Sequence, residues 1–171
     1  MFKSARHALQ FTFRTLGTPI VKMSSINNMR GSGGNGDMTP HDRHAQAAMI
    51  MAMVERVVDV NGLAYLKAQY GRELTGGEEA DKIRETLVRC AMAAMPTGVH
   101  SSRGVSKLIS IYFGGKVSMT SVRTDFRCRN EQCQVYKTIV SDMLDVVGRR
   151  AEDEVYRILD KAGLIAMVIS A

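Results

Sequence analysis

The chain has 171 residues, 45% of them hydrophobic, with 12 Met, 15 Gly, 3 Pro and no Trp. This length and apolar content allow one domain that buries most of its apolar surface, and they exclude a largely disordered chain. The apolar runs fall far short of the roughly 18 to 20 residues that cross a bilayer, which excludes a membrane span. Three cysteines do not make a disulfide framework and no secretory apolar region is present, so we expect a reducing, cytosolic setting.

The net charge of +6 is concentrated in two blocks of the chain. Residues 1–36 contain five basic and no acidic side chains, and residues 101–137 contain seven basic and two acidic ones. The segments 37–100 and 138–171 each carry a net charge of −2. Clustered positive charge is expected for contact with a polyanion, because each neutralised phosphate releases condensed counterions. Ordinary solvated helix faces would give the same blocks, so both interpretations stay open.

The first predicted helix covers residues 4–16 and ends at Gly17. Its apolar face consists of Ala5, Leu9, Phe13 and Leu16, at helical spacing. A basic, acid-free amphipathic start is also typical of a mitochondrial transit peptide, although the usual Ser-rich continuation is missing. A helix of a bacterial or viral protein would look the same, and we favour that interpretation.

Residues 24–38 are rich in Gly and Asn and predict a flexible loop. A Gly-rich loop can cradle phosphate, but this one lacks the G-x-x-x-x-G-K-[ST] pattern and no strand leads into it. We therefore divide the chain into a basic N-terminal helix with its Gly-rich loop, residues 1–38, and a helical domain, residues 39–171.

A strong helix start follows the loop. Thr39 is a suitable N-cap, Pro40 suits the first helical position, and Asp42 places an acid in the first turn. The helix is expected to run to about Val58. Its predicted inward side chains are Ala45, Met49, Met53, Val54 and Val57.

Two more helices are predicted before residue 96. Asn61-Gly62 is expected to break the preceding helix, and a short helix then runs to Gly71. Thr75 and Glu78 form a predicted capping box for a helix over residues 76–95. The predicted inward side chains of that helix are Ile83, Leu87, Cys90, Ala91 and Ala94.

Two helices joined by a short glycine turn lie inside the second basic block, in the segment 103–129. The first spans residues 105–113 and stops at Gly114-Gly115, and the second spans residues 118–129. In a helix-turn-helix, the first helix braces the pair while the second presents its N-terminal side chains to the major groove. The standard spacing would need apolar residues at Thr120 and Arg123, where this chain is polar. An ordinary basic helical hairpin therefore stays an alternative.

The exposed polar residues of this segment are the predicted contacts to duplex DNA. Base edges would be read from the start of the second helix, by Ser118, Thr120, Ser121, Arg123 and Thr124. Phosphates would be held by basic side chains, namely Arg127 and Arg129 together with Lys107 and Lys116, and Arg103 belongs to the same DNA-contacting set.

A long C-terminal helix completes the predicted fold. Apolar positions recur at helical spacing from Cys133 onward without Pro or Gly until Gly148, and then again up to Gly163. This pattern predicts one long helix, or two helices with a bend at Gly148. The fold class that we predict is all-α, a compact multi-helix domain with a helix-turn-helix-like pair and a long C-terminal helix.

No constellation of residues predicts catalysis. We find no Ser-His-Asp or Cys-His arrangement, and the acidic clusters lie in exposed helical positions, where solvated carboxylates are ordinary. The pairs His41/His44 and Cys128/Cys133 lack the usual zinc-ligand spacing. We therefore expect no enzyme, no metal site and no cofactor.

The run FTFRTLGTPIVKMSSINNMRGSGGNGDMTPHDRHAQAAMI, residues 11–50, resembles the opening of small proteins encoded by bacteriophages and prophages. The basic helical pair and the long terminal helix are similar in layout to phage late-gene antitermination proteins of the Q type. The resemblance implies a cytoplasmic factor in a bacterial host cell that binds DNA near a promoter and engages RNA polymerase. Because the zinc-ligating cysteine clusters of some Q-type proteins are absent, only the zinc-free kind applies.

The alternative function is a helical protein-protein interaction module. In this interpretation the Met-rich segment 49–53 and the C-terminal helix pack against a partner, or against a second copy in a homo-oligomer. The positive charge would then serve solubility only.

Overall fold

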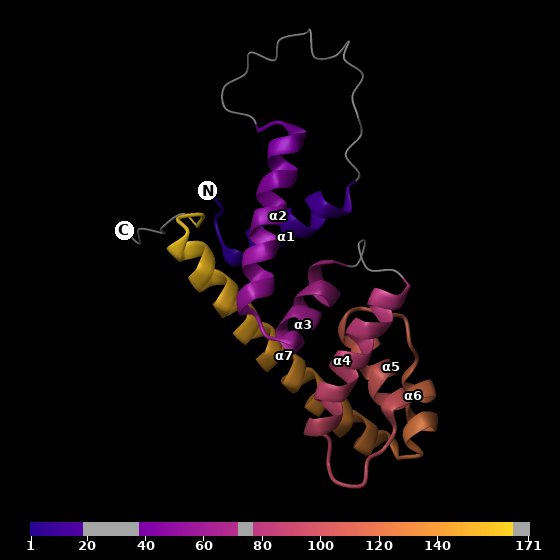
Figure 1. Cartoon of the computed structure of the whole chain (residues 1–171). Coiled ribbons are helices and arrows are strands. Elements are labelled where there is room, and N and C mark those ends of the chain that lie inside the picture. Colours follow the sequence, from indigo (N-terminus) through magenta and orange to yellow (C-terminus); the bar gives the residue numbers. More distant parts are fainter. Residues whose placement is uncertain (19–37, 72–76, 166–171) are drawn as a thin grey trace.

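The described part of the chain is helical. The computed structural model describes residues 1–18, 38–71 and 77–165 (Figure 1). Within these ranges the helices are α1 (Ala5–Gly17), α2 (Pro40–Val57), α3 (Val60–Tyr70), α4 (Glu78–Ala94), α5 (Ser102–Tyr112), α6 (Met119–Phe126) and α7 (Asn130–Lys161). The predicted all-α fold with a long C-terminal helix is confirmed. None of the described helices combines the length and the apolar composition that a bilayer span requires.

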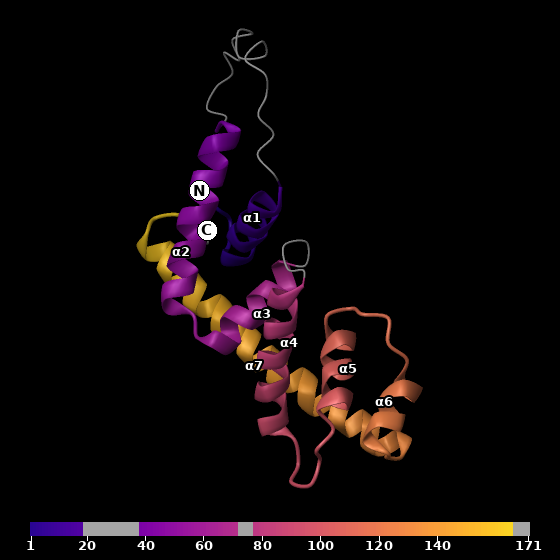
Figure 2. The same cartoon turned by 45° about the vertical axis from the view of Figure 1, so that its right-hand side comes forward.

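Helix α7 runs along the whole molecule and contacts each of the other described helices. Helices α1, α2 and α3 lie towards its C-terminal end, whereas α5 and α6 lie at its N-terminal end (Figures 1 and 2). Its buried stripe consists of Cys133, Val140, Leu144, Gly148, Ala151, Val155 and Leu159. The helix is continuous through Gly148, so of the two predicted alternatives the structure has the single long helix.

Gly148 allows α3 to approach α7 closely. A Cβ atom at this position would clash with the Tyr65 ring of α3. The Tyr65 hydroxyl lies 3.2 Å from the hydroxyl of Tyr112 in α5, which donates a hydrogen bond of 2.5 Å to Asp145 of α7. Burial raises the pKa of Tyr112, and the bond to Asp145 raises it further, so the phenol stays protonated as a donor. Three helices are thereby joined at one point.

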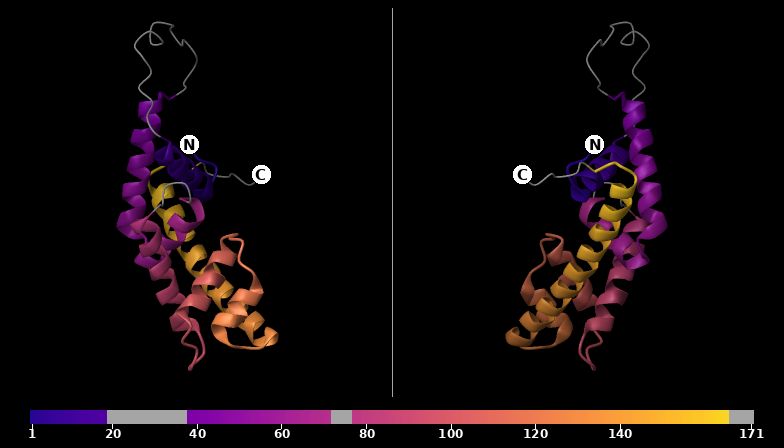
Figure 3. Two further views of the ribbon diagram at one scale, coloured as in Figure 1. Left: turned by 90° about the vertical axis from the view of Figure 1, so that its right-hand side faces the viewer. Right: turned by 90° about the vertical axis from the view of Figure 1, so that its left-hand side faces the viewer.

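Helix α1 is packed into the bundle. Leu9 and Phe13 are buried, as the sequence predicts, whereas Leu16 is only half-buried. At the end of α7, the backbone N–H of Phe2 donates a hydrogen bond of 2.7 Å to the carbonyl of Leu164. The beginning and the end of the described chain therefore lie together, as Figure 3 shows from two further sides.

The start of α2 is predicted correctly, whereas its buried face is predicted only in part, by Val54 and the half-buried Met53. Thr39 caps the helix, and its side chain and the Asp42 carboxylate form a capping box. The buried side chains are Ala47, Ile50 and Val54, whereas the predicted Ala45, Met49 and Val57 are exposed. The segment has apolar residues around most of its circumference, so their spacing alone does not define which side meets α1 and α7.

The break between α2 and α3 also differs from the prediction. The chain turns at Val58 and Asp59, and the Asp59 carboxylate accepts a hydrogen bond of 2.7 Å from the Gly62 N–H. Asn61 and Gly62 therefore lie within the first turn of α3 rather than between helices. An N-cap aspartate dominates here, because it satisfies a free N–H group of the new helix.

The start of α4 is later than predicted. Its N-cap is Gly77, which makes no side-chain cap hydrogen bond, and the predicted cap Thr75 lies outside the described residues. Among the predicted inward side chains, Leu87 and Ala91 are buried, Ile83 and Cys90 are half-buried, and Ala94 is exposed.

We expect Gly148→Ala to destabilise the protein by about 1–3 kcal/mol, because the new methyl group meets the Tyr65 ring. The loss is that which remains after the roughly 1 kcal/mol that alanine gains over glycine in a helix interior. Urea unfolding followed by circular dichroism measures the difference. Asp142→Ala, at an exposed position of the same helix, is the control and should change stability by less than about 0.5 kcal/mol. A Gly148→Ala variant as stable as the parent would contradict this account of the α3–α7 contact.

Candidate nucleic-acid interface

Helices α5 and α6 form the pair that the sequence places in the second basic block. Ser101 caps α5 by accepting a hydrogen bond from the Gly104 N–H, and Ser118 caps α6 by accepting one from the Ser121 N–H. The connection covers residues 113–118, with Gly114 at a φ of 81°. This connection is longer than the three or four residues of a standard helix-turn-helix.

The two helices pack closely through small and apolar residues. A Cβ atom on Gly104 would lie 2.6 Å from the Phe126 ring, so glycine permits the contact. Val122 of α6 is fully buried and Met119 is half-buried, whereas Thr120 and Arg123 are exposed. The inward positions of α6 thus lie one residue earlier than in the standard motif, as the sequence indicates.

Lys107, a predicted phosphate contact, is held by residues of α6. Its ammonium group lies 2.5 Å from Asp125 Oδ2 and also donates hydrogen bonds to the side-chain and backbone oxygens of Ser121. The Lys107 side chain is only 22% exposed. The contact to Oδ2 is ionic and lacks the geometry of a regular hydrogen bond, since that oxygen has no such partner. Lys107 and Ser121 therefore join α5 to α6.

Arg103 is only loosely engaged. Its Nε atom lies 3.8 Å from Asp125 Oδ1, and its side chain is 81% exposed. An exposed pair at this distance contributes little to stability. The guanidinium group is therefore accessible at the beginning of α5.

The exposed polar residues of α6 lie on one side of the helix. Thr120, Arg123 and Thr124 are within three or four residues of one another or adjacent, and Arg127 follows directly after the end of the helix; all four are exposed. Three further predicted residues flank them in the adjoining loops and are also exposed, namely Lys116, Ser118 and Arg129. We call these seven residues the α6 face. Within the described ranges, none of its four cations forms a salt bridge with a carboxylate.

Helix α6 is shorter than predicted because it ends in a left-handed residue. The helix stops at Phe126, and Arg127 has a φ of 50° and a ψ of 40°. Among the described residues, Arg127 is the only one other than glycine with a positive φ. Arg127 and Arg129 thus lie in the turn before α7, whereas the sequence prediction has them on the second helix of the pair.

Asp125 is the important residue that the sequence analysis did not single out. It is the acidic residue of α6, and it points towards α5, where Lys107 neutralises it. Asp125 lies 18 positions after Lys107 in the sequence, and Lys107 lies four after Arg103. These spacings do not indicate that Lys107 and Asp125 pair across two helices. Lys137, an exposed cation in the second turn of α7, also belongs to the basic block but not to the predicted set.

The first basic block lies at the other end of the molecule. Lys3 and Arg14 are exposed at α1, and Arg6 forms a salt bridge of 3.3 Å with Glu152 of α7. Figures 1 and 2 show α1 far from α6. The remaining cations of this block, Lys22 and Arg30, lie outside the described residues.

The described His and Cys residues do not assemble a metal site. No three His, Cys, Asp or Glu side chains come together within the described ranges in the way that a metal ion requires. Both ring nitrogens of His44 face carbonyl oxygens, those of Pro40 and Thr18. Burial raises the pKa of the Cys133 thiol, which favours the protonated form over the thiolate that binds metals.

Comparison with known proteins gives no match, either to the model of a protein family or to a curated protein.

We expect Arg127→Gly to stabilise the fold by about 0.5–1 kcal/mol, because glycine adopts the left-handed conformation without the strain that a Cβ atom causes. Arg127→Ala removes the same charge but keeps the Cβ atom, so it should not be stabilised. Thermal unfolding of the two variants and the parent separates the effect of the lost charge from the effect of the relieved backbone strain. Equal stability of the glycine and alanine variants would contradict the backbone argument.

Proposed function

We propose that the chain binds duplex DNA through the α6 face. The observation that carries this proposal is the separation of charge on α6. The single acid of the helix is turned towards α5 and paired with Lys107, so the outer side presents cations and neutral hydroxyl groups only. A surface of this kind attracts phosphate, and its short polar side chains suit hydrogen bonding to base edges.

Two kinds of contact follow from the positions of these residues. Thr120, Arg123 and Thr124 lie on the helix itself and would reach base edges in the major groove. Lys116, Arg127 and Arg129 lie in the flanking loops and would contact the phosphates on either side. Arg103 supports the phosphate contacts from the start of α5. Helix α1 makes no contact in this proposal, because it lies at the opposite end of the molecule.

The biological role that we propose rests on the sequence resemblance to phage late-gene antitermination proteins. It is that of a phage transcription regulator that binds a specific DNA site and acts with RNA polymerase in the bacterial cytoplasm. The DNA contact and the polymerase contact would use different surfaces, since the α6 face occupies one end of the molecule only.

Fluorescence anisotropy with labelled duplex DNA at several salt concentrations tests the DNA contact. We expect affinity to fall steeply with salt. Arg127→Gly should weaken binding to all sequences and lower the salt slope by about 1, although it stabilises the fold. Arg123→Ala should cost about 1–3 kcal/mol and reduce discrimination between sequences.

Arg150→Ala is the matched control for both variants. Arg150 is exposed on α7, away from the α6 face, and its replacement lowers the net charge by the same amount. It should leave the affinity almost unchanged. Absence of binding at low salt, or equal losses in Arg150→Ala and Arg127→Gly, would contradict the proposal.

A second candidate function, protein-protein interaction, is favoured by exposed apolar residues on α2 and α3. Met49, Val57 and Val60 are 45%, 53% and 73% exposed, although residues of this kind usually lie in a core. If they form an interface, light scattering should show an oligomer without nucleic acid, and Val57→Asp together with Val60→Asp should return it to a monomer. A monomeric parent chain at high concentration would contradict self-association through this surface.

A further inference from the structure

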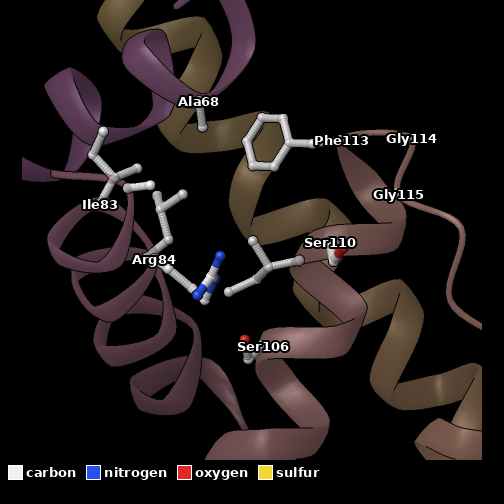
Figure 4. Close-up of a pocket in the computed structure, with 11 residues that line it drawn as sticks. Ala68, Ile83, Arg84, Ser106, Ser110, Phe113, Gly114 and Gly115 are labelled. Atoms are coloured by element: carbon white, nitrogen blue, oxygen red, sulfur yellow. The ribbon is translucent and has the colours of Figure 1, made fainter. Parts of the chain in front are cut away.

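A groove of about 310 Å³ lies between α4 and α5, apart from the α6 face (Figure 4). Its apolar walls come from three helices: Ala68 of α3, Ile83 and Leu87 of α4, and Ile109 of α5. Phe113, at the end of α5, adds an aromatic ring. The volume is at the lower end of the range for small-molecule sites, about 300–1,000 Å³. It is therefore sized for a single ring or a short branched chain.

Three polar side chains converge on this groove. Figure 4 shows the Arg84 guanidinium directed into it, with Ser106 and Ser110 on the side of α5. Arg84 uses one donor for a bond of 2.9 Å to Asp81, and a guanidinium group has five donors. Donors thus remain for a ligand, and a guanidinium forms strong charge-assisted hydrogen bonds with a carboxylate.

The two serine hydroxyls are not used by the described protein. Helical hydroxyls commonly bond to the carbonyl four residues earlier, as Thr86, Thr124 and Thr138 do in this structure. Neither Ser106 nor Ser110 makes such a bond or any other side-chain hydrogen bond within the described ranges, although both are half-buried. Neither hydroxyl oxygen belongs to the buried unpaired atoms of the described residues, so both reach solvent and can bond to a ligand.

We infer that this groove binds a small aromatic carboxylate. The apolar walls and Phe113 would hold the ring, and the carboxylate would accept hydrogen bonds from Arg84 and from a serine hydroxyl. An inorganic anion would leave the apolar walls uncovered, and a neutral aromatic compound would leave the guanidinium without its partner. The apolar walls together with the Arg84 guanidinium therefore favour a ligand that carries both an aromatic ring and a carboxylate.

The position of the groove connects it to the α6 face. Gly114 and Gly115, in the connection that leads to α6, form one edge of it. Gly115 is pressed against Ser110, since a Cβ atom there would clash with the Ser110 hydroxyl. A ligand seated on Ser110 therefore touches the segment that sets the start of α6. This regulatory part rests on the proposed DNA binding, and by linkage DNA would change the ligand affinity by the same factor.

Titration of the protein with sodium benzoate in the absence of DNA tests the site directly. We expect saturable chemical-shift changes in the NMR resonances of Ser106, Ser110 and Phe113. Benzamide, which has the same ring without the charge, should bind about tenfold or more weakly. Failure of benzoate to cause saturable shifts, or equal binding of benzamide, would overturn the inference.

Variants of two arginines on α4 complete the test. Arg84→Gln should weaken benzoate binding by about tenfold or more. Arg89→Gln is the matched control, because Arg89 lies on the same helix in a similar pair with Glu85 but does not line the groove. Equal losses of benzoate affinity in both variants would show that the carboxylate does not bind at Arg84 and would contradict the proposed site.

The regulatory part is measured separately, by anisotropy with DNA in the presence and absence of saturating benzoate. A shift in DNA affinity that Arg84→Gln abolishes supports the coupling, and an unchanged affinity contradicts it. If the protein binds benzoate but no DNA, the ligand site is supported and the proposed DNA-binding function is refuted.

Discussion

The close approach of α3 to α7 at Gly148 is the contact on which the rest of the fold depends. With no side chain at this position, the Tyr65 ring lies against the middle of α7, and its hydroxyl reaches Tyr112 of α5. Tyr112 in turn bonds to Asp145, one turn before Gly148. Because every other described helix contacts α7, the position of this single junction determines how the α1–α3 end and the α5–α6 end are held relative to each other. A densely packed interior transmits a shift at such a point to its neighbours.

Much of the helical layout can be predicted from the sequence, because caps and periodicity act locally. Thr39 with Pro40 and Gly71 mark helix ends where the structure has them. The predictions fail where a local signal competes with another or with tertiary packing. Asn61-Gly62 predicts a turn, but the Asp59 cap starts α3 before these residues, and Gly62 packs against Ala151. On α2, apolar residues lie on several sides, and only the positions of α1 and α7 decide which are buried.

The candidate site is predictable in its location but not in its detailed composition. The net charge of the sequence identifies the segment 101–137 as the basic block that contains the candidate site. The structure has the side chains of Arg123, Arg127 and Arg129 exposed, as predicted. Charge counting treats all lysines as equal, however, and cannot indicate that Lys107 faces a carboxylate on the next helix. Such pairing depends on the angle and distance between two helices, which no short sequence window contains. The pairing removes one cation from the surface and also hides the acid that would have weakened the field of the others.

The contact between Phe2 and Leu164 has a consequence for how the protein is made. A ribosome synthesises a chain from its N-terminus, so α1 emerges before the other described helices, whereas α7, which completes its surroundings, is made after them. Until α7 has left the ribosome, part of the apolar surface of α1 has no partner. Contacts between such distant segments slow folding, because the loop entropy is lost before they form. Apolar surface that is exposed in this way during folding favours aggregation until its partner helix is present.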